Sequence, residues 1–523
     1  MPKKMKLEIE PELNENLWGG DVLGRKRYAD FLTKYIVRKV NPRENEYYPF
    51  CIALDAKWGF GKTFFIQNWA KQITADGVHS VFTFDAWKAD YQTDPLIAFM
   101  ASFSEAMNKQ INKLSIDKKI KIKIQEKIKE GIRTARSAIL PVGKVVALGV
   151  VKKISGVAFD EVYGLVKGEG YEDVNFDEIE GGAVEQLDRA LEKYFEDDLK
   201  QQANRNSLFI GFKKSIYEAL ELLQNDGGMK LPLIIFVDEI DRCRPSFSLE
   251  LLEVLKHVFD IPGVCFVIAT NLSELSHAVG ALYGSSFNGR GYLQRFFNAE
   301  YTLPPPDGEV YAQALMNEFF SGVPQNLYLG LPMGGFKDQK ISSDFPMAFS
   351  WVSECFNLDL RSQRKVMEII DAVLVSVDPK YPVHILWLTI LVVLRLKNPD
   401  FFELISRSEV LPDKLTELWG EVTTNDKKKE FITPRDSIYL NQSPVFNSVY
   451  LRMVFLTYYK LSWQDIRKLK DTSNTAQPNI YDYPDSISKK IEEEVPNSYP
   501  SNSIQNASIR SYYELIQYAG HLA

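Results

Sequence analysis

The chain has 523 residues, of which 45% are hydrophobic and 25% charged, as is typical of a globular protein with a substantial core. Its net charge of −7 excludes a general electrostatic attraction to nucleic acid. The four cysteines and five histidines show no metal-ligand or redox spacing, which fits a protein of the reducing cytoplasm.

The most apolar stretches of the sequence lie at residues 137–151 and 383–396. Both are shorter than the roughly 20 residues that a membrane-spanning helix needs. The first seventeen residues also lack the apolar core of a signal peptide. We therefore expect a cytoplasmic protein without a transmembrane segment, with peripheral attachment to a membrane left open.

A glycine-rich turn lies between a predicted strand, "PFCIALD" at residues 49–55, and a predicted helix, "TFFIQNWAKQI" at residues 63–73. The turn follows the pattern G-x-x-x-x-G-K-[ST], except that Ala56 replaces the first glycine. A strand, a glycine turn and a helix together bind phosphate through backbone N–H groups and the helix dipole. An ordinary strand–helix turn is the alternative.

This turn predicts a division of roles. Lys62 would reach the β- and γ-phosphates, and the Thr63 hydroxyl would be a ligand of Mg²⁺. The predicted nucleotide-binding residues of the turn are Lys57, Trp58, Gly59, Phe60, Gly61, Lys62, Thr63 and Phe64.

A long insertion follows, because about 150 residues separate Trp87 from Asp238, where one crossover helix would suffice. The insertion is strongly basic over residues 109–153 and strongly acidic over residues 160–198. In its basic part, isoleucines recur every four residues, at Ile116, Ile120, Ile124, Ile128 and Ile132.

That spacing predicts an amphipathic helix surrounded by lysines. We expect the helix to pair with the acidic segment of the same insertion. Binding to an anionic membrane surface or to a nucleic-acid backbone are the alternatives for residues 109–153.

A second strand with chemistry at its end is predicted in "LPLIIFVDEIDRC". Its apolar run, residues 233–237, delivers Asp238 and Glu239 to the carboxyl edge of a parallel sheet, where such sheets bind ligands. Asp238 suits a ligand of Mg²⁺, and Glu239 suits the general base that activates water. A helix cap is the alternative reading of this acidic pair.

A further strand, "GVCFVIATN", ends in Thr270 and Asn271. These polar groups could sense the γ-phosphate, or they could simply lead the strand into a turn. The N-K-x-D element that usually confers guanine specificity does not follow this strand, which favours ATP.

The run from residue 237 to residue 275, "VDEIDRCRPSFSLELLEVLKHVFDIPGVCFVIATNLSEL", resembles the KAP family of P-loop NTPases, relatives of the AAA+ and STAND ATPases. The stretches "DVLGRKRYADFL", "VFTFDAWKADYQTDPL" with Trp87, "GYLQRFFNAEYTLPPP", "DLRSQRKVMEII" and "LVVLRLKNPDFFELI" agree with the same family. The resemblance covers roughly residues 20–110 and 205–405. Ala56 and Asn271 depart from the family pattern.

The resemblance implies an α/β fold, a doubly wound parallel sheet that binds ATP and Mg²⁺. It predicts an NTPase domain over residues 1–335 that contains a helical insertion at 103–205. A helical lid bundle at 340–420 and an accessory region at 421–523 complete the expected organisation.

Two arginines acquire roles from the resemblance. Arg295, in "YLQRFF", resembles the arginine that acts on a neighbouring subunit's γ-phosphate, which implies a homo-oligomer. Arg361, in "DLRSQR", resembles a sensor arginine of the lid, with Arg364 as its rival. A surface arginine in a salt bridge is the alternative for Arg295, and a charge on the helix surface is the alternative for Arg361.

The C-terminal part reads as helical at first and then as loops. The segment "PVHILWLTILVVLRL" is apolar on every side, which predicts a buried central helix of the lid. The final "IRSYYELIQYAGHLA" predicts a short amphipathic helix, in which the aromatic residues pack in the core or dock a partner protein.

These features together predict an ATPase that works as an oligomerising switch or motor. Prokaryotic members of the family are often associated with phage exclusion, so the resemblance implies a bacterial defence or stress assembly. A scaffold ATPase on a membrane surface and a nucleic-acid-dependent ATPase are the alternatives.

Overall fold

The computed structural model describes residues 17–139, 208–320, 327–329 and 341–423, apart from residues 44, 45, 93, 258, 259, 378–382 and 408. It also describes residues 430–431, 445–446, 511–519 and most of 451–459. The chain forms two compact units. The first unit comprises Met1–Gly19, Lys26–Lys57 and Lys62–Leu303, and the second comprises Gly20–Arg25, Trp58–Gly61 and Pro304–Ala523.

The first unit is built on a five-stranded sheet in the order β2-β3-β4-β1-β5, in which every neighbouring pair is parallel. The strands are β1 (Phe50–Asp55), β2 (His79–Asp85), β3 (Lys230–Asp238), β4 (Val264–Thr270) and β5 (Ala299–Thr302). Asp55 pairs in register with Thr270, and Asp85 with Asp238. The polar ends of four strands therefore reach the same edge of the sheet.

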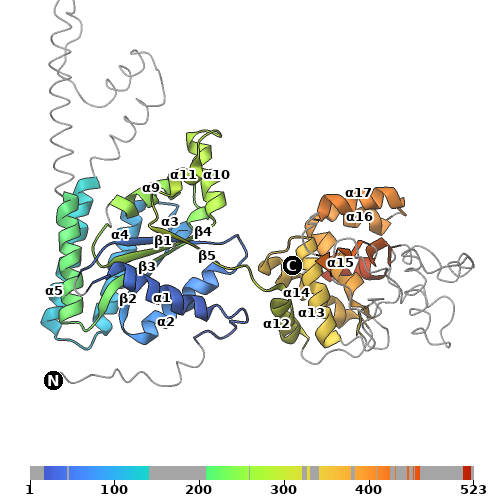
Figure 1. Ribbon diagram of the computed structural model, residues 1–523, viewed down its shortest axis with the longest axis horizontal. Helices are drawn as coiled ribbons and strands as arrows, with labels where there is room; N and C mark the ends of the chain where they lie inside the picture. The colour runs from blue at the N-terminus through green and yellow to red at the C-terminus, as the bar shows by residue number, and fades with distance from the viewer. Residues whose placement is uncertain are drawn as a thin grey trace, which may run out of the picture. The chain divides into compact units, whose positions relative to one another are not determined.

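Helices cover both faces of this sheet (Figure 1). Helices α1 (Lys26–Val40) and α2 (Lys62–Asp76) lie on one face, and α4 (Pro95–Lys113) and α9 (Pro245–His257) lie on the other. Alternate residues of the strands point to opposite faces. Phe236 packs on Trp69 of α2, and Phe82 packs on Phe99 of α4, with ring centroids 4.9 Å and 5.6 Å apart.

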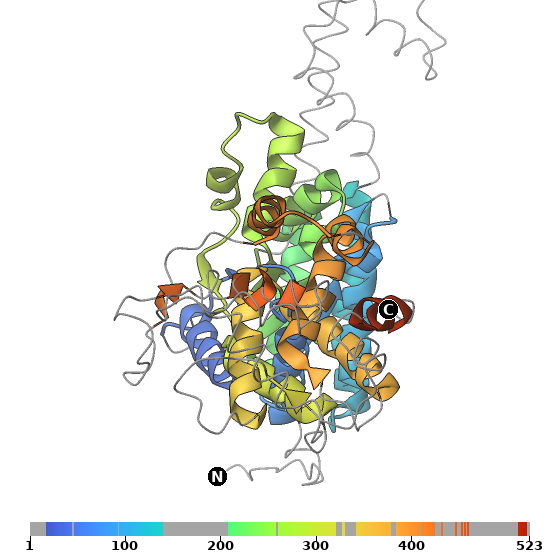
Figure 2. The same ribbon diagram turned by 90° about the vertical axis from the view of Figure 1, so that its right-hand side faces the viewer.

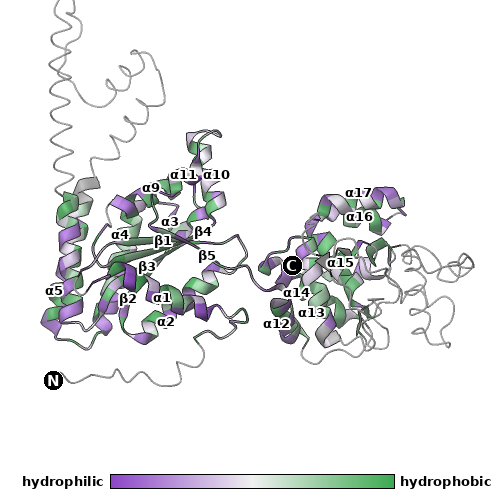
Figure 3. Ribbon diagram, in the orientation of Figure 1, coloured by the Kyte–Doolittle hydropathy of each residue, from purple (hydrophilic) through white to green (hydrophobic). Residues whose placement is uncertain are grey.

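Both faces of the sheet are thus covered by apolar contacts, and Figure 3 shows its strands largely in the colours of hydrophobic residues. The predicted α/β class with a doubly wound parallel sheet is confirmed.

Helix α5 (Lys118–Ile139) is the predicted basic amphipathic helix, and purple and green residues alternate along it in Figure 3. It packs against the helical segment 208–225. A Cβ atom added at Gly131 would lie 3.2 Å from Ile216, and one added at Gly211 would lie 3.3 Å from Thr134. Along the contact, residue numbers increase in α5 while they decrease in the segment 208–225, so the two helices run antiparallel.

The apolar face of α5 is buried within the first unit. Ile124, Ile128 and Ile132 are 0%, 2% and 8% exposed, and they belong to the same core cluster as helix α4. Residues 103–113, which the sequence assigned to the insertion, lie on α4, where they pack into this core as well. The acidic segment 160–198, the expected partner of α5, lies outside the described residues.

The described part of the second unit is mainly helical, and Figure 2 shows its helices from a second side. Its helices are α12 (Gly308–Phe319), α13 (Ile341–Cys355), α14 (Leu360–Ser376), α15 (Ile385–Lys397), α16 (Pro399–Arg407), α17 (Pro412–Val422) and α21 (Ser511–Ala519). Two pairs of two-residue strands accompany them: β6 (Leu327–Tyr328) with β7 (Val383–His384), and β8 (Glu430–Phe431) with β9 (Val445–Phe446).

Helix α15 forms the centre of this unit, since residues 385–394 are all buried. This confirms the buried helix expected from the sequence. Helix α21 buries Tyr512, Tyr513 and Ile516 in the same core cluster, as the core interpretation of the C-terminal aromatic residues requires. Helix α12 also contributes Leu315 and Met316 to this cluster, and the contact-based division of the chain accordingly falls between Leu303 and Pro304.

Candidate functional site

The predicted phosphate-binding turn joins strand β1 to helix α2, and Lys62 is the first residue of that helix. Gly59 and Gly61 have φ angles of 75° and 81°, a left-handed conformation that residues with a Cβ rarely adopt. The first turn of α2 holds no acidic residue, so no side-chain carboxylate there competes for its positive dipole end. The local backbone therefore has the features that an anion-binding turn needs.

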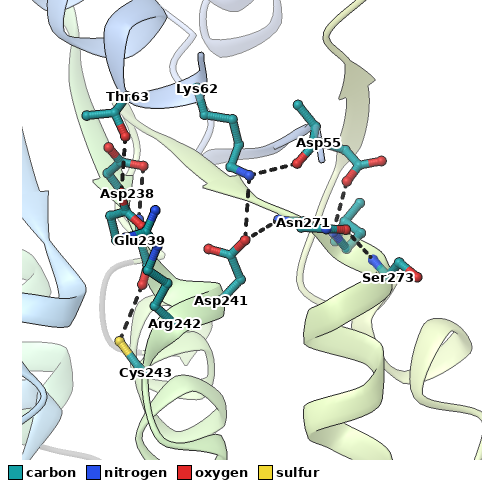
Figure 4. Close-up of polar contacts among 12 residues, drawn as sticks. Asp55, Lys62, Thr63, Asp238, Glu239, Asp241, Arg242, Cys243, Asn271 and Ser273 are labelled. Carbon is teal, nitrogen blue, oxygen red and sulfur yellow. Dashed lines mark hydrogen bonds and ion pairs between the residues drawn. The ribbon is translucent and has the colours of Figure 1, made fainter. Parts of the chain in front are cut away.

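Thr63 lies close to Asp238, the last residue of β3, and to Glu239, which follows it, at the carboxyl edge of the sheet, as Figure 4 shows. The Thr63 hydroxyl donates to Oε1 of Glu239 over 3.2 Å and is also hydrogen-bonded to Asp238. The two stretches are 176 positions apart in sequence. The fold thus brings together the residues for which the sequence predicts metal binding and base catalysis.

Lys62 is nearly buried, and its ammonium group has two partners (Figure 4). Nζ donates to the carbonyl oxygen of Ala56 over 2.7 Å and lies 3.6 Å from Oδ2 of Asp241. The same oxygen of Asp241 accepts a 2.8 Å hydrogen bond from the backbone N–H of Asn271, at the end of β4. Asp241 therefore connects the lysine of the turn to the strand that lies between β1 and β3.

Carboxylates outnumber cations in this region. Asp55, Asp238, Glu239 and Asp241 are accompanied by Lys62 and Arg242. Burial raises the pKa of Asp238 to about 6; the hydrogen bond from Thr63 opposes this rise, and the charge of Glu239 adds to it. An excess of negative charge at a partly buried edge suits a divalent cation.

The donor set fits Mg²⁺ only if the nucleotide shares in binding it. The described residues contain no group of three or more His, Cys, Asp or Glu side chains that could hold a metal. Mg²⁺ typically takes one or two protein oxygens and completes its shell with phosphate oxygens and water. Thr63 and Asp238 provide two such oxygens.

Glu239 has an unusual backbone and a partner for each side-chain oxygen. Its φ angle is 62°, left-handed for a residue with a side chain, and its N–H donates to Oδ1 of Asp238 over 2.9 Å. Oε2 forms an ion pair with Nε of Arg242, in the 3₁₀ turn Ile240–Arg242. The side chain is therefore held on both sides.

The other residues of the turn differ in exposure. The side chains of Lys57, Trp58 and Phe64 are exposed, and Phe60 is half-buried. Their contribution to nucleotide binding stays a prediction. Asn271 uses its side-chain oxygen to cap helix α10 (Leu272–Tyr283) by accepting from the N–H of Ser273. This is the turn-forming alternative for Asn271, and γ-phosphate sensing stays a prediction.

The two predicted arginines are both exposed. Arg295 follows helix α11 (Gly289–Leu293), and its guanidinium lies 5.8 Å from the ring centroid of Tyr292. Within the described part of the chain it makes no ion pair, in contrast to the salt-bridge alternative. Arg361 lies on the first turn of α14, whereas its rival Arg364 is paired with Glu318 and Glu368. The roles in trans and as a sensor stay predictions.

Asp241 and Arg242 are the site residues that sequence reasoning missed. Both belong to the "DEIDR" run that was examined only for its first two acids. The available signal was a third carboxylate and a cation within four positions of a strand end. Only the fold shows that they contact Lys62 and Glu239.

No helix within the described residues combines the length and the apolar character needed to cross a bilayer. A search of the curated proteins returned no match to this chain.

The family comparison agrees with the geometry. Residues 25–370 match the model of the KAP family P-loop domain. That range contains the glycine turn, the acidic strand end and all five strands of the sheet. Since the match covers more than half of the sequence, the chain belongs to the KAP family and carries a nucleotide-binding P-loop NTPase domain.

Proposed function

We propose that this protein binds ATP with Mg²⁺ at the carboxyl edge of the sheet and hydrolyses the γ-phosphate. The observation that carries the proposal is that the Thr63 hydroxyl is hydrogen-bonded to both Asp238 and Glu239. These acids lie at the end of β3, and only β4 separates β3 from β1, the strand that leads to the turn with Lys62. When bound, Mg²⁺ would neutralise charge that develops on the phosphates. Lys62 would bind the β- and γ-phosphate oxygens, and Glu239 would take the proton of the attacking water.

Nucleotide binding would exchange existing contacts for new ones. Lys62 would leave Asp241 and the Ala56 carbonyl for phosphate oxygens. Thr63 and Asp238 would exchange their mutual hydrogen bond for the cation. These exchanges replace one set of charge contacts by another.

We further propose that the ATPase acts as a homo-oligomeric switch or motor, with Arg295 offered to a neighbouring subunit. The exposure of Arg295 supports this, because a residue that acts in trans must be accessible. A role in a bacterial defence or stress assembly rests on family resemblance alone.

A nucleic-acid-dependent ATPase is the second candidate. The apolar face of α5 is buried in protein, which disfavours insertion of that face into a membrane surface. Lysines on its outer face stay exposed, at Lys118, Lys119, Lys123 and Lys129. DNA or RNA that stimulates hydrolysis with a steep salt dependence would favour this candidate, and stimulation by anionic vesicles would favour the membrane-surface scaffold.

The test compares Glu239→Gln with the parent protein. We expect the variant to bind ATP with the parent affinity and to hydrolyse it at least 100-fold more slowly, since positioned bases contribute about 10²–10⁴-fold. Glu274→Gln changes a partly exposed side chain on α10 that pairs with His277, and this matched control should hydrolyse ATP at the parent rate.

Mass photometry of the parent and of Glu239→Gln, with and without ATP, tests the oligomeric switch. ATP should raise the mass of both proteins, and the larger species should persist in Glu239→Gln. Hydrolysis by Glu239→Gln at the parent rate would show that the base is another residue. A mass that is independent of ATP would contradict the switch.

A further inference from the structure

We propose that Arg242, supported by Trp87, is a positioning residue that holds Glu239 in an idle orientation and must leave it before water is activated. This inference rests on the proposed role of Glu239 as general base. It adds two residues to the hydrolysis site that neither the sequence patterns nor the family match assigns to the reaction.

The contacts of Glu239 show why the observed orientation is idle. One carboxylate oxygen accepts from Thr63, and the other is paired with the guanidinium of Arg242. A general base needs an acceptor oxygen within hydrogen-bond reach of the attacking water. Mg²⁺ binding would remove Thr63 from the first oxygen, but Arg242 would still compete with water for the second.

Arg242 is in turn held by an aromatic ring. Its Cζ lies 5.7 Å from the ring centroid of Trp87, within the range of a cation–π contact. Trp87 lies on the short helix α3 (Ala86–Ala89), which directly follows β2. Because Asp85 at the end of β2 pairs with Asp238 at the end of β3, the two turns that follow these strands lie side by side.

The exposure of these side chains allows Arg242 to move. The side chain of Arg242 is 31% exposed and that of Glu239 is 18% exposed, while Trp87 is 55% exposed. Arg242 can therefore leave Glu239 and remain over the ring or in water without becoming a buried unpaired charge. By contrast, the Lys62–Asp241 pair is almost fully buried and needs a replacement partner before it opens.

The backbone of Glu239 is strained, and a side-chain contact of its neighbour holds it. A left-handed φ of 62° is strained for glutamate, and such strain is concentrated at active sites and switch regions. The N–H bond to Asp238 holds this conformation. Binding of a cation by Asp238 would alter that contact at the same time as the γ-phosphate arrives.

The test is steady-state ATP hydrolysis by Arg242→Ala, Arg242→Lys and Trp87→Phe. We expect Arg242→Ala to raise kcat about 3- to 10-fold with KM unchanged, because one competitor of the attacking water has gone. Arg242→Lys should lie between the parent and Arg242→Ala, and Trp87→Phe should raise kcat less than 3-fold. Arg244→Ala is the matched control, since Arg244 pairs with Asp90 instead, and should keep the parent kcat.

Tryptophan emission provides a readout that does not depend on turnover. ATP and Mg²⁺ should change the emission of the parent, and the part of that change that comes from Trp87 should be lost in Trp87→Phe, while the part that comes from Trp58 in the predicted nucleotide-binding turn should remain. The proposal is overturned if Arg242→Ala lowers kcat, if it leaves kcat unchanged, or if Trp87→Phe retains the full emission change.

The kinetics of these variants distinguish an error in the proposed function from an error in the proposed idle orientation of Glu239. Arg242→Ala combined with Glu239→Gln should be as inactive as Glu239→Gln alone. If Glu239→Gln is inactive but Arg242→Ala has the kcat of the parent, only the positioning role of Arg242 is wrong. If Glu239→Gln is fully active, the assignment of the base is wrong and the positioning role falls with it.

Discussion

The sheet edge of the first unit and the helical core of the second unit bury different kinds of polar group. At the sheet edge of the first unit, a lysine and an aspartate are buried as an ion pair, surrounded by further carboxylates. Among the described residues of the helical core around α15, the buried polar groups are uncharged, such as Thr389 and the hydroxyls of Tyr458 and Tyr512. Charges that balance one another can be redistributed when a ligand arrives, whereas neutral hydrogen bonds inside an aromatic core only fix the packing.

Burial of an ionisable group affects stability in both units for the same physical reason, but the dependence of stability on pH is opposite in the two. It raises the pKa of Asp238 to about 6 and lowers the pKa of His384 to about 4, because each group avoids its charged form. The stability from Asp238 is present at low pH and is lost as the pH rises towards 6. The stability from His384 is present above about pH 6.5 and is lost as the pH falls towards 4.

The largest expected effect is that of Trp387→Ala, which removes the centre of the second core. Trp387 is fully buried and packs against Phe455, Tyr458 and Tyr513. We expect a loss of about 3–5 kcal/mol in the free energy of unfolding of this unit. Urea-dependent proteolysis, followed by mass spectrometry of the fragments, would measure the midpoint for each unit separately.

The two core clusters share no residue, so peptides from the first unit should keep the parent midpoint in this variant. Val375→Ala removes a side chain that is 83% exposed and is the matched control. An equal loss in both units would show that they unfold together, and the comparison between them would fail.

The next effect is the acid sensitivity of the second unit. Between pH 6.5 and pH 4, the unfolded chain takes up a proton at residue 384 that the folded unit resists. This difference lowers the free energy of unfolding by about 3 kcal/mol. Urea midpoints of α15 and α21 peptides measured across this range should show the loss.

His384→Gln should remove that part of the pH dependence, whatever its effect on stability at neutral pH. His277→Gln changes a histidine that is 76% exposed and should retain the full dependence. If His384→Gln loses as much free energy of unfolding in acid as the parent does, the loss comes from other titratable groups.

The smallest expected change in free energy is a loss of ATP affinity, and it tests the nucleotide site directly. Lys62→Met should weaken ATP binding at least 100-fold, a loss of about 2.8 kcal/mol, because a neutral side chain gives the phosphates no charge. Lys71→Met, on the exposed side of the same helix, should bind as the parent does. Calorimetric titration with ATP and Mg²⁺ would measure both, and equal affinities would contradict the assignment of Lys62.

The sequence predicted three of the strands because they depend on local patterns. Apolar runs followed by polar residues gave β1, β3 and β4, and parallel strands necessarily end at one edge. That argument predicts that Thr63 lies near Asp238 and Glu239, and the structure shows this contact.

Residues Asp241 and Arg242 could not be placed in this way. Their directions depend on the left-handed conformation of Glu239, which turns the chain immediately after β3. A sequence pattern does not show a φ angle at a residue other than glycine. Helix α5 illustrates a second limit: its isoleucine spacing identified the apolar face, but its described partners are α4 and the segment 208–225.

The antiparallel packing of α5 against the segment 208–225 has a consequence for how this protein can vary. Thr134 and Gly211 are neighbours, so the chain leaves and rejoins the P-loop unit at nearly one point. Because these two positions are close, a change in the number of residues between them should add little closure cost to the fold of the sheet.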